Sequence, residues 1–167
     1  MRCTCPPTLT LIAAAASVAA GLAGTLAARA ADAPAYPQGA AAFQANCALC
    51  HGPAGAGVPA LAPPLLSYPA RYATSAEGRR QLALTVLYGM FGEITVGEVH
   101  FNAQMPDFAR LDDATLAATL NFLVFDIGHA PAGIKPLTAE EIAAERAHAL
   151  DAAAVREHRK SLAPGGP

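Results

Sequence analysis

The sequence is poor in the large side chains that usually fill a protein core. It has no tryptophan, and aromatic residues make up only 6% of its 167 residues. Although 53% of the residues are hydrophobic, many of these are alanine, which buries little apolar area. The length suits one domain with some surplus and excludes two well-built cores. We therefore expect a group other than the polypeptide to complete the core.

Charge is scarce as well. Charged residues make up 14% of the chain, and 11 basic against 13 acidic residues leave a formal net charge of −2. Such a balance provides no positive field for a polyanion, and nucleic acid is therefore not expected as a partner. The high apolar content excludes an intrinsically disordered chain.

A charge-free run of twenty residues, Leu9 to Ala28, lies near the N-terminus. It follows the basic Arg2 and ends at small residues, with Ala28 and Ala30 at positions −3 and −1 of a cut after Ala30. This pattern is typical of a secretory signal peptide, and residues 1–30 are predicted to direct export to the periplasm. An uncleaved anchor is the alternative, because twenty apolar residues can span a bilayer. Cleavage would leave a protein that is not integral to the membrane.

Cleavage would leave Cys47 and Cys50 as the two cysteines of the mature chain. It would also remove two arginines, so that nine basic residues face 13 acidic ones and the mature protein is mildly acidic. We divide the rest of the chain into a lead at 31–35, a domain at 36–130, and a linker with a C-terminal helical extension at 131–167.

Periodicity and capping residues predict four helices within the mature chain. They are expected near 38–46, 75–91, 112–127 and 138–160. Between the first two, four prolines and three glycines in 52–67 exclude regular structure and indicate an ordered loop. A brief strand is indicated at 94–96.

The last helix has the clearest start signal and the weakest apolar face. Thr138 and Glu141 form a capping box, but the apolar stripe of Ile142, Ala149 and Ala153 is thin. A helix with so little apolar surface is expected to be solvated and packed lightly on the domain.

The run Cys47-Ala48-Leu49-Cys50-His51 matches the c-type haem attachment motif, Cys-x-x-Cys-His. Two cysteines three residues apart at a helix end face the same side, so both sulfurs can add to the vinyl groups on one edge of a haem. The histidine that follows is then held under the iron as the proximal ligand. One covalently bound haem would also supply the missing core.

Three other interpretations of the motif explain less. A thioredoxin-like redox pair needs a βαβ context that this alanine-rich helical chain lacks. A zinc site needs four ligands in paired groups, whereas the remaining histidines are scattered. A plain disulfide would leave His51 and the glycine-proline loop unexplained.

The order of these features resembles the class I cytochromes c over residues 36–130. The matching features are a helix with Gly39 and Phe43, the attachment motif, a glycine-proline loop, a middle helix, a Met-Pro segment and a final helix. The resemblance implies an all-α fold of three core helices and ordered loops around one covalent haem c, with Phe122 packing where the first and last helices cross. It also implies that the carbonyl of Pro63 or Pro64 orients His51, and the doublet leaves both open.

The sixth iron ligand is expected among Met90, Met105, His100 and His129. Met90 continues the apolar stripe of the middle helix, which favours core packing. Met105 lies in an irregular stretch directly before Pro106, where the family pattern places its axial methionine. The resemblance therefore assigns the metal ligands as His51 and Met105, and nothing in the spacing favours either histidine.

A histidine-methionine pair leaves no iron position open for substrate, and the expected chemistry is electron transfer between Fe(II) and Fe(III). The sequence thus predicts a periplasmic one-electron carrier, or the electron-accepting cytochrome subunit of an oxidoreductase complex, rather than an enzyme. The expected donor is an exported dehydrogenase, and the acceptor an oxidase or another cytochrome. The alternatives are a peroxidase-like enzyme or gas-binding protein with a displaceable methionine, for which Gln104 and Asp107 are the nearest polar residues, or a docking or sensor subunit that uses 138–160.

Overall fold

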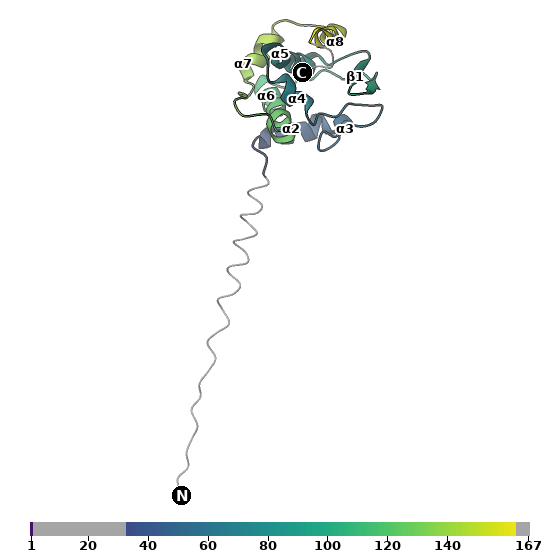
Figure 1. Cartoon of the computed structure of the whole chain (residues 1–167). Helices are drawn as coiled ribbons and strands as arrows, with labels where there is room; N and C mark the ends of the chain where they lie inside the picture. Colours follow the sequence, from purple (N-terminus) through teal and green to yellow (C-terminus); the bar gives the residue numbers. More distant parts are fainter. Residues whose placement is uncertain (2–32, 163–167) are drawn as a thin grey trace. The chain divides into compact units, whose positions relative to one another are not determined.

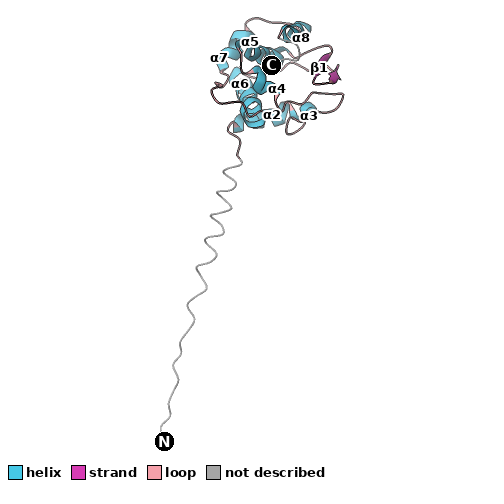
Figure 2. Cartoon of the chain, viewed as in Figure 1, coloured by secondary structure: helices cyan, strands magenta, loops and turns pink. Residues whose placement is uncertain are grey.

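A computed structural model describes Met1 and residues 33–162 of the chain. The predicted signal peptide therefore lies outside the described residues, apart from Met1. Residues 34–162 belong to one compact unit, in which helices predominate and the strands are few (Figures 1 and 2). Its elements are α2 (Pro37–Asn46), α3 (Ala48–His51), α4 (Tyr68–Tyr72), α5 (Ala76–Tyr88), β1 (Ile94–Val96), β2 (Val99–Phe101), α6 (Asp113–Asn121), η1 (Phe122–Ile127), α7 (Ala139–Arg146) and α8 (Ala152–Ser161).

Helices α2 and α6 cross in close contact at Gly39. A Cβ at this buried glycine would lie 2.0 Å from the carbonyl oxygen of Ala118, so the crossing requires a residue without a side chain. Beside it, the rings of Phe43 and Phe122 pack with their centroids 5.6 Å apart, and Phe43 is fully buried. The predicted crossing and its aromatic partner are confirmed.

The two central helices begin where their capping residues predict. The Ser75 hydroxyl accepts a hydrogen bond from the backbone N–H of Gly78 at the start of α5. The Asp112 carboxylate likewise accepts from the N–H of Thr115 at the start of α6. Helix α5 ends at Tyr88, three residues earlier than predicted, because Gly89 turns the chain with a φ of +70°.

The helix that starts at α6 changes its geometry before it ends. Residues 122–127 form the π-helical segment η1, and the N–H of Gly128 bonds back to the carbonyl of Leu123. The predicted end near Gly128 is confirmed. The wider final turn was not predicted, because the buried residues Phe122, Leu123 and Val124 give no periodicity that separates it from an α-helix.

The loop at 52–67 is ordered, as predicted. Gly57 has a φ of +81°, and a Cβ there would lie 2.6 Å from the backbone nitrogen of Pro64, so the loop folds tightly on itself. It leads into α4, a short helix that the sequence analysis did not predict. The strand at 94–96 is confirmed as β1, which pairs antiparallel with β2 in a hairpin.

The C-terminal extension differs from the prediction in two respects. It consists of two helices, α7 and α8, because Asp151 accepts a hydrogen bond from the N–H of Ala154 and starts a new helix. The Tyr88 hydroxyl contacts the carbonyl oxygens of Glu145 and Arg146 at the end of α7, 3.0 Å from each. The extension is also firmly packed, since Ile142 and Val155 are both fully buried.

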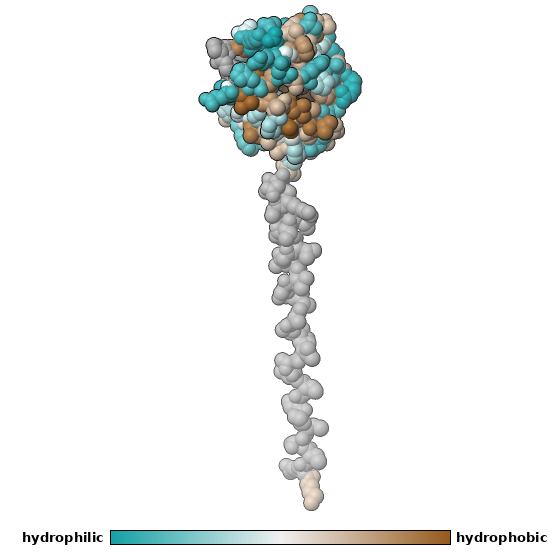
Figure 3. Space-filling model, turned by 90° about the vertical axis from the view of Figure 1, so that its right-hand side faces the viewer, coloured by the Kyte–Doolittle hydropathy of each residue, from teal (hydrophilic) through white to brown (hydrophobic). Residues whose placement is uncertain are grey.

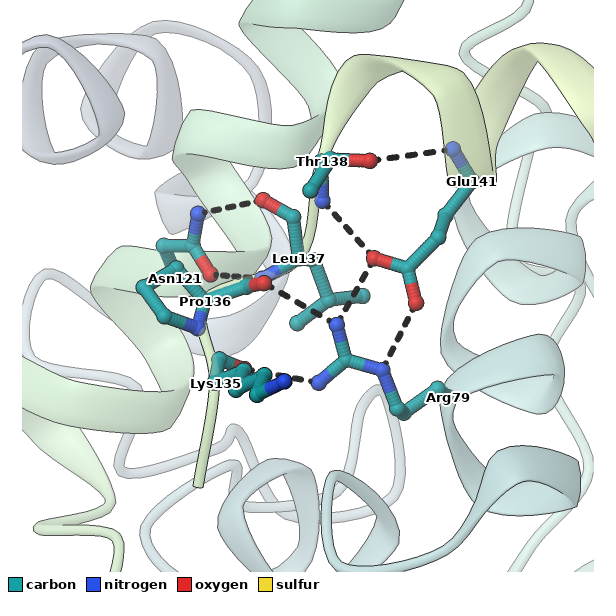
Figure 4. A network of polar contacts seen from close by, with 7 residues as sticks. All are labelled: Arg79, Asn121, Lys135, Pro136, Leu137, Thr138 and Glu141. Atoms are coloured by element: carbon teal, nitrogen blue, oxygen red, sulfur yellow. Dashed lines mark hydrogen bonds and ion pairs between the residues drawn. The ribbon is translucent and has the colours of Figure 1, made fainter. Parts of the chain in front are cut away.

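The junction before α7 is held by a network of polar contacts (Figure 4). The Arg79 guanidinium of α5 donates to both carboxylate oxygens of Glu141, each at 2.7 Å. The Asn121 side chain of α6 bonds both the N–H and the carbonyl of Leu137. The capping box of Thr138 and Glu141 is present as predicted. Together these bonds connect the extension to α5 and α6.

In the part of the chain that the structure describes, no helix is both long and apolar enough to span a membrane.

Candidate functional site

A large apolar cavity lies among the helices and loops. Its volume is about 430 Å³, within the usual range for a bound organic group. The residues that the sequence analysis selected line it together: Cys47, Cys50, His51, Pro63, Pro64 and Met105. Most other lining side chains are apolar, among them Leu82, Val86, Leu120 and Leu123. On the side that carries β1 and α3, Figure 3 shows hydrophobic side chains gathered among hydrophilic ones.

The attachment motif occupies the junction of α2 and α3. Cys47 is the residue at which α2 ends and α3 begins, and the single turn of α3 brings Cys50 and His51 to the same cavity. Both cysteines are free and partly buried. Burial raises the pKa of the Cys47 thiol to about 11, although the nearby Arg110 acts in the opposite direction. Cys47 is thus held as a neutral thiol facing an apolar space.

The loop carbonyl fixes the orientation of His51. The Nδ1 atom of its ring lies 2.9 Å from the carbonyl oxygen of Pro63, which selects Pro63 over Pro64 as the contact residue. Burial lowers the pKa of His51, and the Pro63 carbonyl partly counteracts this. A neutral ring that donates from Nδ1 leaves Nε2 with a free lone pair, the form that ligates a metal.

The two methionine candidates lie side by side. Met90 and Met105 exchange two backbone hydrogen bonds, of 3.1 and 3.0 Å, and both side chains line the cavity. Gly89 permits this contact, since a Cβ there would lie 2.3 Å from the carbonyl oxygen of Met105. Met90 is buried in a cluster with Leu84 and Val155, so its predicted packing role is confirmed. It lies just after α5, not within it.

The two histidine candidates do not line the cavity. His100 is exposed on β2, where its Nδ1 lies 2.7 Å from a Glu93 carboxylate oxygen. His129 follows η1 with a φ of +47°. Gln104 and Asp107, the polar residues near Met105, do line the cavity.

Tyr72 and Arg159 are among the polar residues of the cavity that the sequence analysis missed. Tyr72 comes from α4, which has no clear periodic signal, and it is only 5% exposed. Arg159 comes from the last turn of α8, where a basic residue suits the helix dipole and gives no sign of a cavity. Both line the cavity. Nothing in the local sequence relates these positions, because only the folded chain brings α4 and α8 to the same space.

Comparison with known proteins identifies this arrangement. Residues 37–124 match the family model "Cytochrome c". The chain belongs to the cytochrome c family. It is also 40% identical over 124 residues to "Cytochrome c-552" of Thermus thermophilus, an alignment that covers 73% of this chain and 95% of the relative. A second cytochrome c-552 of the same species is 40% identical over 124 residues and is covered to 84%.

Membership of the family establishes the predicted class. The chain is a monohaem class I c-type cytochrome with the corresponding mostly helical fold, and its cofactor is one covalently bound haem c. It is an electron-carrier haem protein. The observed site fits this cofactor, because a cysteine pair, a neutral histidine and a methionine border one apolar cavity. The family match ends at residue 124, so α7 and α8 lie beyond it.

Proposed function

We propose that the protein is a periplasmic one-electron carrier whose haem is attached through thioethers to Cys47 and Cys50 and ligated by His51 and Met105. The observation that carries the proposal is that these four side chains, which span 59 sequence positions, line one cavity. When bound, the haem supplies the Fe(II)/Fe(III) couple, and the polypeptide controls how that couple behaves.

The ligand set determines which redox state is favoured. The Pro63 carbonyl holds His51 in one tautomer and orientation, and this increases the basicity of Nε2 toward a metal. The thioether of Met105 favours the reduced state and raises the reduction potential relative to a second histidine. With His51 and Met105 both holding the iron, no position would be open for a substrate.

The cavity wall supports rapid electron exchange with little rearrangement. Its apolar side chains exclude water, and they keep the local dielectric constant low. At its border, Leu49 and Leu61 line the cavity and are 90% and 45% exposed. Exposed leucines next to a redox group suit a brief apolar contact with a partner protein. The partners we propose are an exported dehydrogenase as donor and an oxidase or another cytochrome as acceptor.

Export is supported by the sequence pattern of residues 1–30, which lies outside the described part of the structure. A c-type haem is anchored by covalent bonds, and so it stays with the protein in the dilute space outside the cytoplasm. A cleaved signal would release the carrier from the membrane.

The thioether assignment is tested by the double variant Cys47→Ser/Cys50→Ser. Exported protein is separated under denaturing conditions, and covalently retained haem is detected by its peroxidase stain. We expect the stain to be lost from the double variant and retained in a matched variant of an exposed residue, Ser161→Ala. Normal haem retention without both cysteines would contradict the attachment.

The carrier assignment is tested by mixing the reduced protein with carbon monoxide at neutral pH. A hexacoordinate carrier is expected to leave the absorption spectrum unchanged over minutes. Rapid stoichiometric binding would instead favour a gas-binding or peroxidase-like protein with a displaceable methionine.

A further inference from the structure

Helix α8 lies along residues 90–95, the segment that leads from α5 into β1. In the last turn of α8, Nη2 of Arg159 donates to the carbonyl oxygen of Thr95 in this segment, at 3.1 Å. The residues of α8 that meet the segment recur at helical spacing, so one face of the helix carries them all. They are Ala152, Val155, Arg156 and Arg159.

The polar contacts of α8 reach the first half of the segment as well. The backbone N–H of Phe91 donates to the carbonyl oxygen of Ala152 at 3.1 Å. The Arg156 side chain lies directly over Gly92, where a Cβ would be 2.9 Å from Nε of the arginine. A side chain at position 92 would therefore displace Arg156, and the segment is shaped to receive α8.

Val155 provides the apolar part of this interface. It is fully buried, as is Leu84 of α5, and the two residues form a cluster with Met90. Met105 packs against this cluster with a partly buried side chain. The α8 residue thus helps to enclose the neighbourhood of the methionine that lines the haem cavity.

The same segment holds the backbone of Met105. The N–H of Met90 donates to the carbonyl oxygen of Met105 at 3.1 Å, and the N–H of Met105 donates to the carbonyl oxygen of Met90 at 3.0 Å. These two bonds use both backbone polar groups of Met105. Met105 can therefore leave its place only if it breaks these bonds or if Met90 moves with it.

We propose that α8, which lies beyond the family match, positions the axial methionine, and that Val155 is a positioning residue for Met105. By packing on Met90 and the residues that follow it, α8 restrains the backbone pair of Met90 and Met105 and keeps the thioether at the cavity. This inference rests on the proposed function, in which Met105 ligates the iron.

The proposal concerns local opening rather than the resting geometry. Segments of a folded protein open locally with free energies smaller than that of global unfolding. An added ligand can replace a protein ligand only in the open state, so its apparent affinity rises in proportion to the population of that state. Loosening α8 should therefore increase the affinity of the ferric protein for a competing ligand.

The experiment compares three holoproteins: wild type, Val155→Ala and Ile142→Ala. Ile142→Ala is the matched control, because Ile142 is also fully buried and belongs to the other C-terminal helix, α7. Its side chain lies in the larger apolar cluster rather than in the cluster of Met90. The ferric proteins are titrated with imidazole and followed by their visible spectra, and global stability is measured by chemical denaturation.

We expect Val155→Ala to bind imidazole about tenfold more tightly than the wild type does. Ile142→Ala should change the affinity by less than about twofold, although it removes a larger side chain and costs at least as much global stability. An unchanged imidazole affinity in Val155→Ala would overturn the proposal. An equal rise in Ile142→Ala would do the same, since it would show that any loss of stability frees the methionine.

A milder variant decides the question should Val155→Ala fail to fold. Leu150 packs against the cluster of Met90 with a partly buried side chain, and Leu150→Ala should raise the imidazole affinity by about threefold. Its matched control is Ile134→Ala, at a partly buried site against the larger cluster. Equal affinities in these two variants would overturn the proposal.

The same measurements separate this inference from the proposed function. The sulfur-to-iron absorption band is recorded for each ferric protein before imidazole is added. Its absence in the wild type would contradict ligation by Met105 and hence the proposed function. Its presence in all proteins, with one imidazole affinity shared by the wild type and the variants, would contradict this inference alone.

Discussion

The backbones of Met90 and Met105 are hydrogen-bonded to each other, yet their side chains have different surroundings. Met90 packs in the cluster of Leu84 and Val155 and is 8% exposed. Met105 is partly buried at the edge of both apolar clusters. Its backbone packs directly against Gly89, which has no side chain to prevent the contact. The packed residue is suited to the core, and the less constrained one is suited to ligation.

We predict that Met105→Ala abolishes the sulfur-to-iron charge-transfer absorption of the oxidised protein and lowers its reduction potential. The physical reason is loss of the thioether that favours the ferrous state. The measurement is the near-infrared edge of the visible spectrum combined with a redox titration.

Met90→Ala provides the matched control for that experiment. It removes the same side chain from the neighbouring position, and we expect it to retain the absorption band while costing about 2–5 kcal/mol of stability. Loss of the band in Met90→Ala but not in Met105→Ala would transfer the ligand assignment to Met90.

The contact between α2 and α6 depends on a single missing side chain. We predict that Gly39→Ala lowers the free energy of unfolding by about 1–3 kcal/mol, because the new Cβ would overlap the Ala118 carbonyl and force the helices apart. This loss exceeds the gain in helix propensity. Thermal unfolding of the holoprotein provides the measurement.

A substitution at an exposed position of α2 controls for the change in helix propensity between glycine and alanine. Ala41 is exposed in α2, and Ala41→Gly should cost at most about 1 kcal/mol. Unchanged or increased stability in Gly39→Ala would show that the crossing is looser than the structure has it.

Each C-terminal helix contributes one buried residue to the core, Ile142 in α7 and Val155 in α8. We predict that Ile142→Ala destabilises the protein by about 2–5 kcal/mol, since Ile142 is fully buried and its truncation leaves a cavity. Ile134→Ala, at a partly buried site in the linker, should cost clearly less. Equal small losses from both variants in chemical denaturation would restore the expectation of a lightly packed extension.

The elements differ in how far the sequence determines them. Helices α2, α5 and α6 were predicted because Ser75 and Asp112 cap the latter two and apolar residues recur at helical spacing. The break between α7 and α8 was missed, because the alanines on both sides of it obscure the N-cap at Asp151. The contact of Tyr88 with the end of α7 depends on tertiary packing. The importance of Val155 was missed for the same reason, since its burial against Leu84 and Met90 depends on tertiary packing.

The residues of the site also differ in how far the local sequence determines them. Two short motifs, Cys-x-x-Cys-His and Met-Pro, predicted Cys47, Cys50, His51 and Met105. The choice of Pro63 over Pro64 needed the position of one carbonyl. Tyr72 and Arg159 carry no local signal, because their association exists only after α4 and α8 have folded onto the same cavity.

For the whole molecule, the pairing of Arg79 with Glu141 links stability to pH. The Arg79 guanidinium holds the pKa of Glu141 below its ordinary value of 4.5. The folded state therefore binds this proton less tightly than the unfolded state does. The stabilisation is fully present above pH 4.5, and it is lost as the pH falls through the lowered pKa of the folded state.

We predict that Glu141→Gln is less stable than the wild type at neutral pH and that the difference shrinks as the pH falls below about 4.5. The effect is modest, since the Glu141 side chain is 39% exposed and solvent screens the pair. Denaturation midpoints across the acidic to neutral range provide the measurement. Glu98→Gln, in the exposed turn between β1 and β2, controls for the loss of one charge, and a parallel pH profile for the two variants would contradict the prediction.

The crossing of α2 and α6 also affects how fast the protein folds. Gly39 and Ala118 meet across about 79 positions of chain, and closing a flexible loop of that length costs about 4 kcal/mol of entropy at room temperature. Most helical proteins of this size form mainly local contacts and fold in microseconds to milliseconds. We expect this chain to fold more slowly than its helix content suggests, with a rate typical of mixed α/β domains. Stopped-flow refolding of the holoprotein with its methionine ligand in place measures that rate, and a microsecond phase with full amplitude would contradict it.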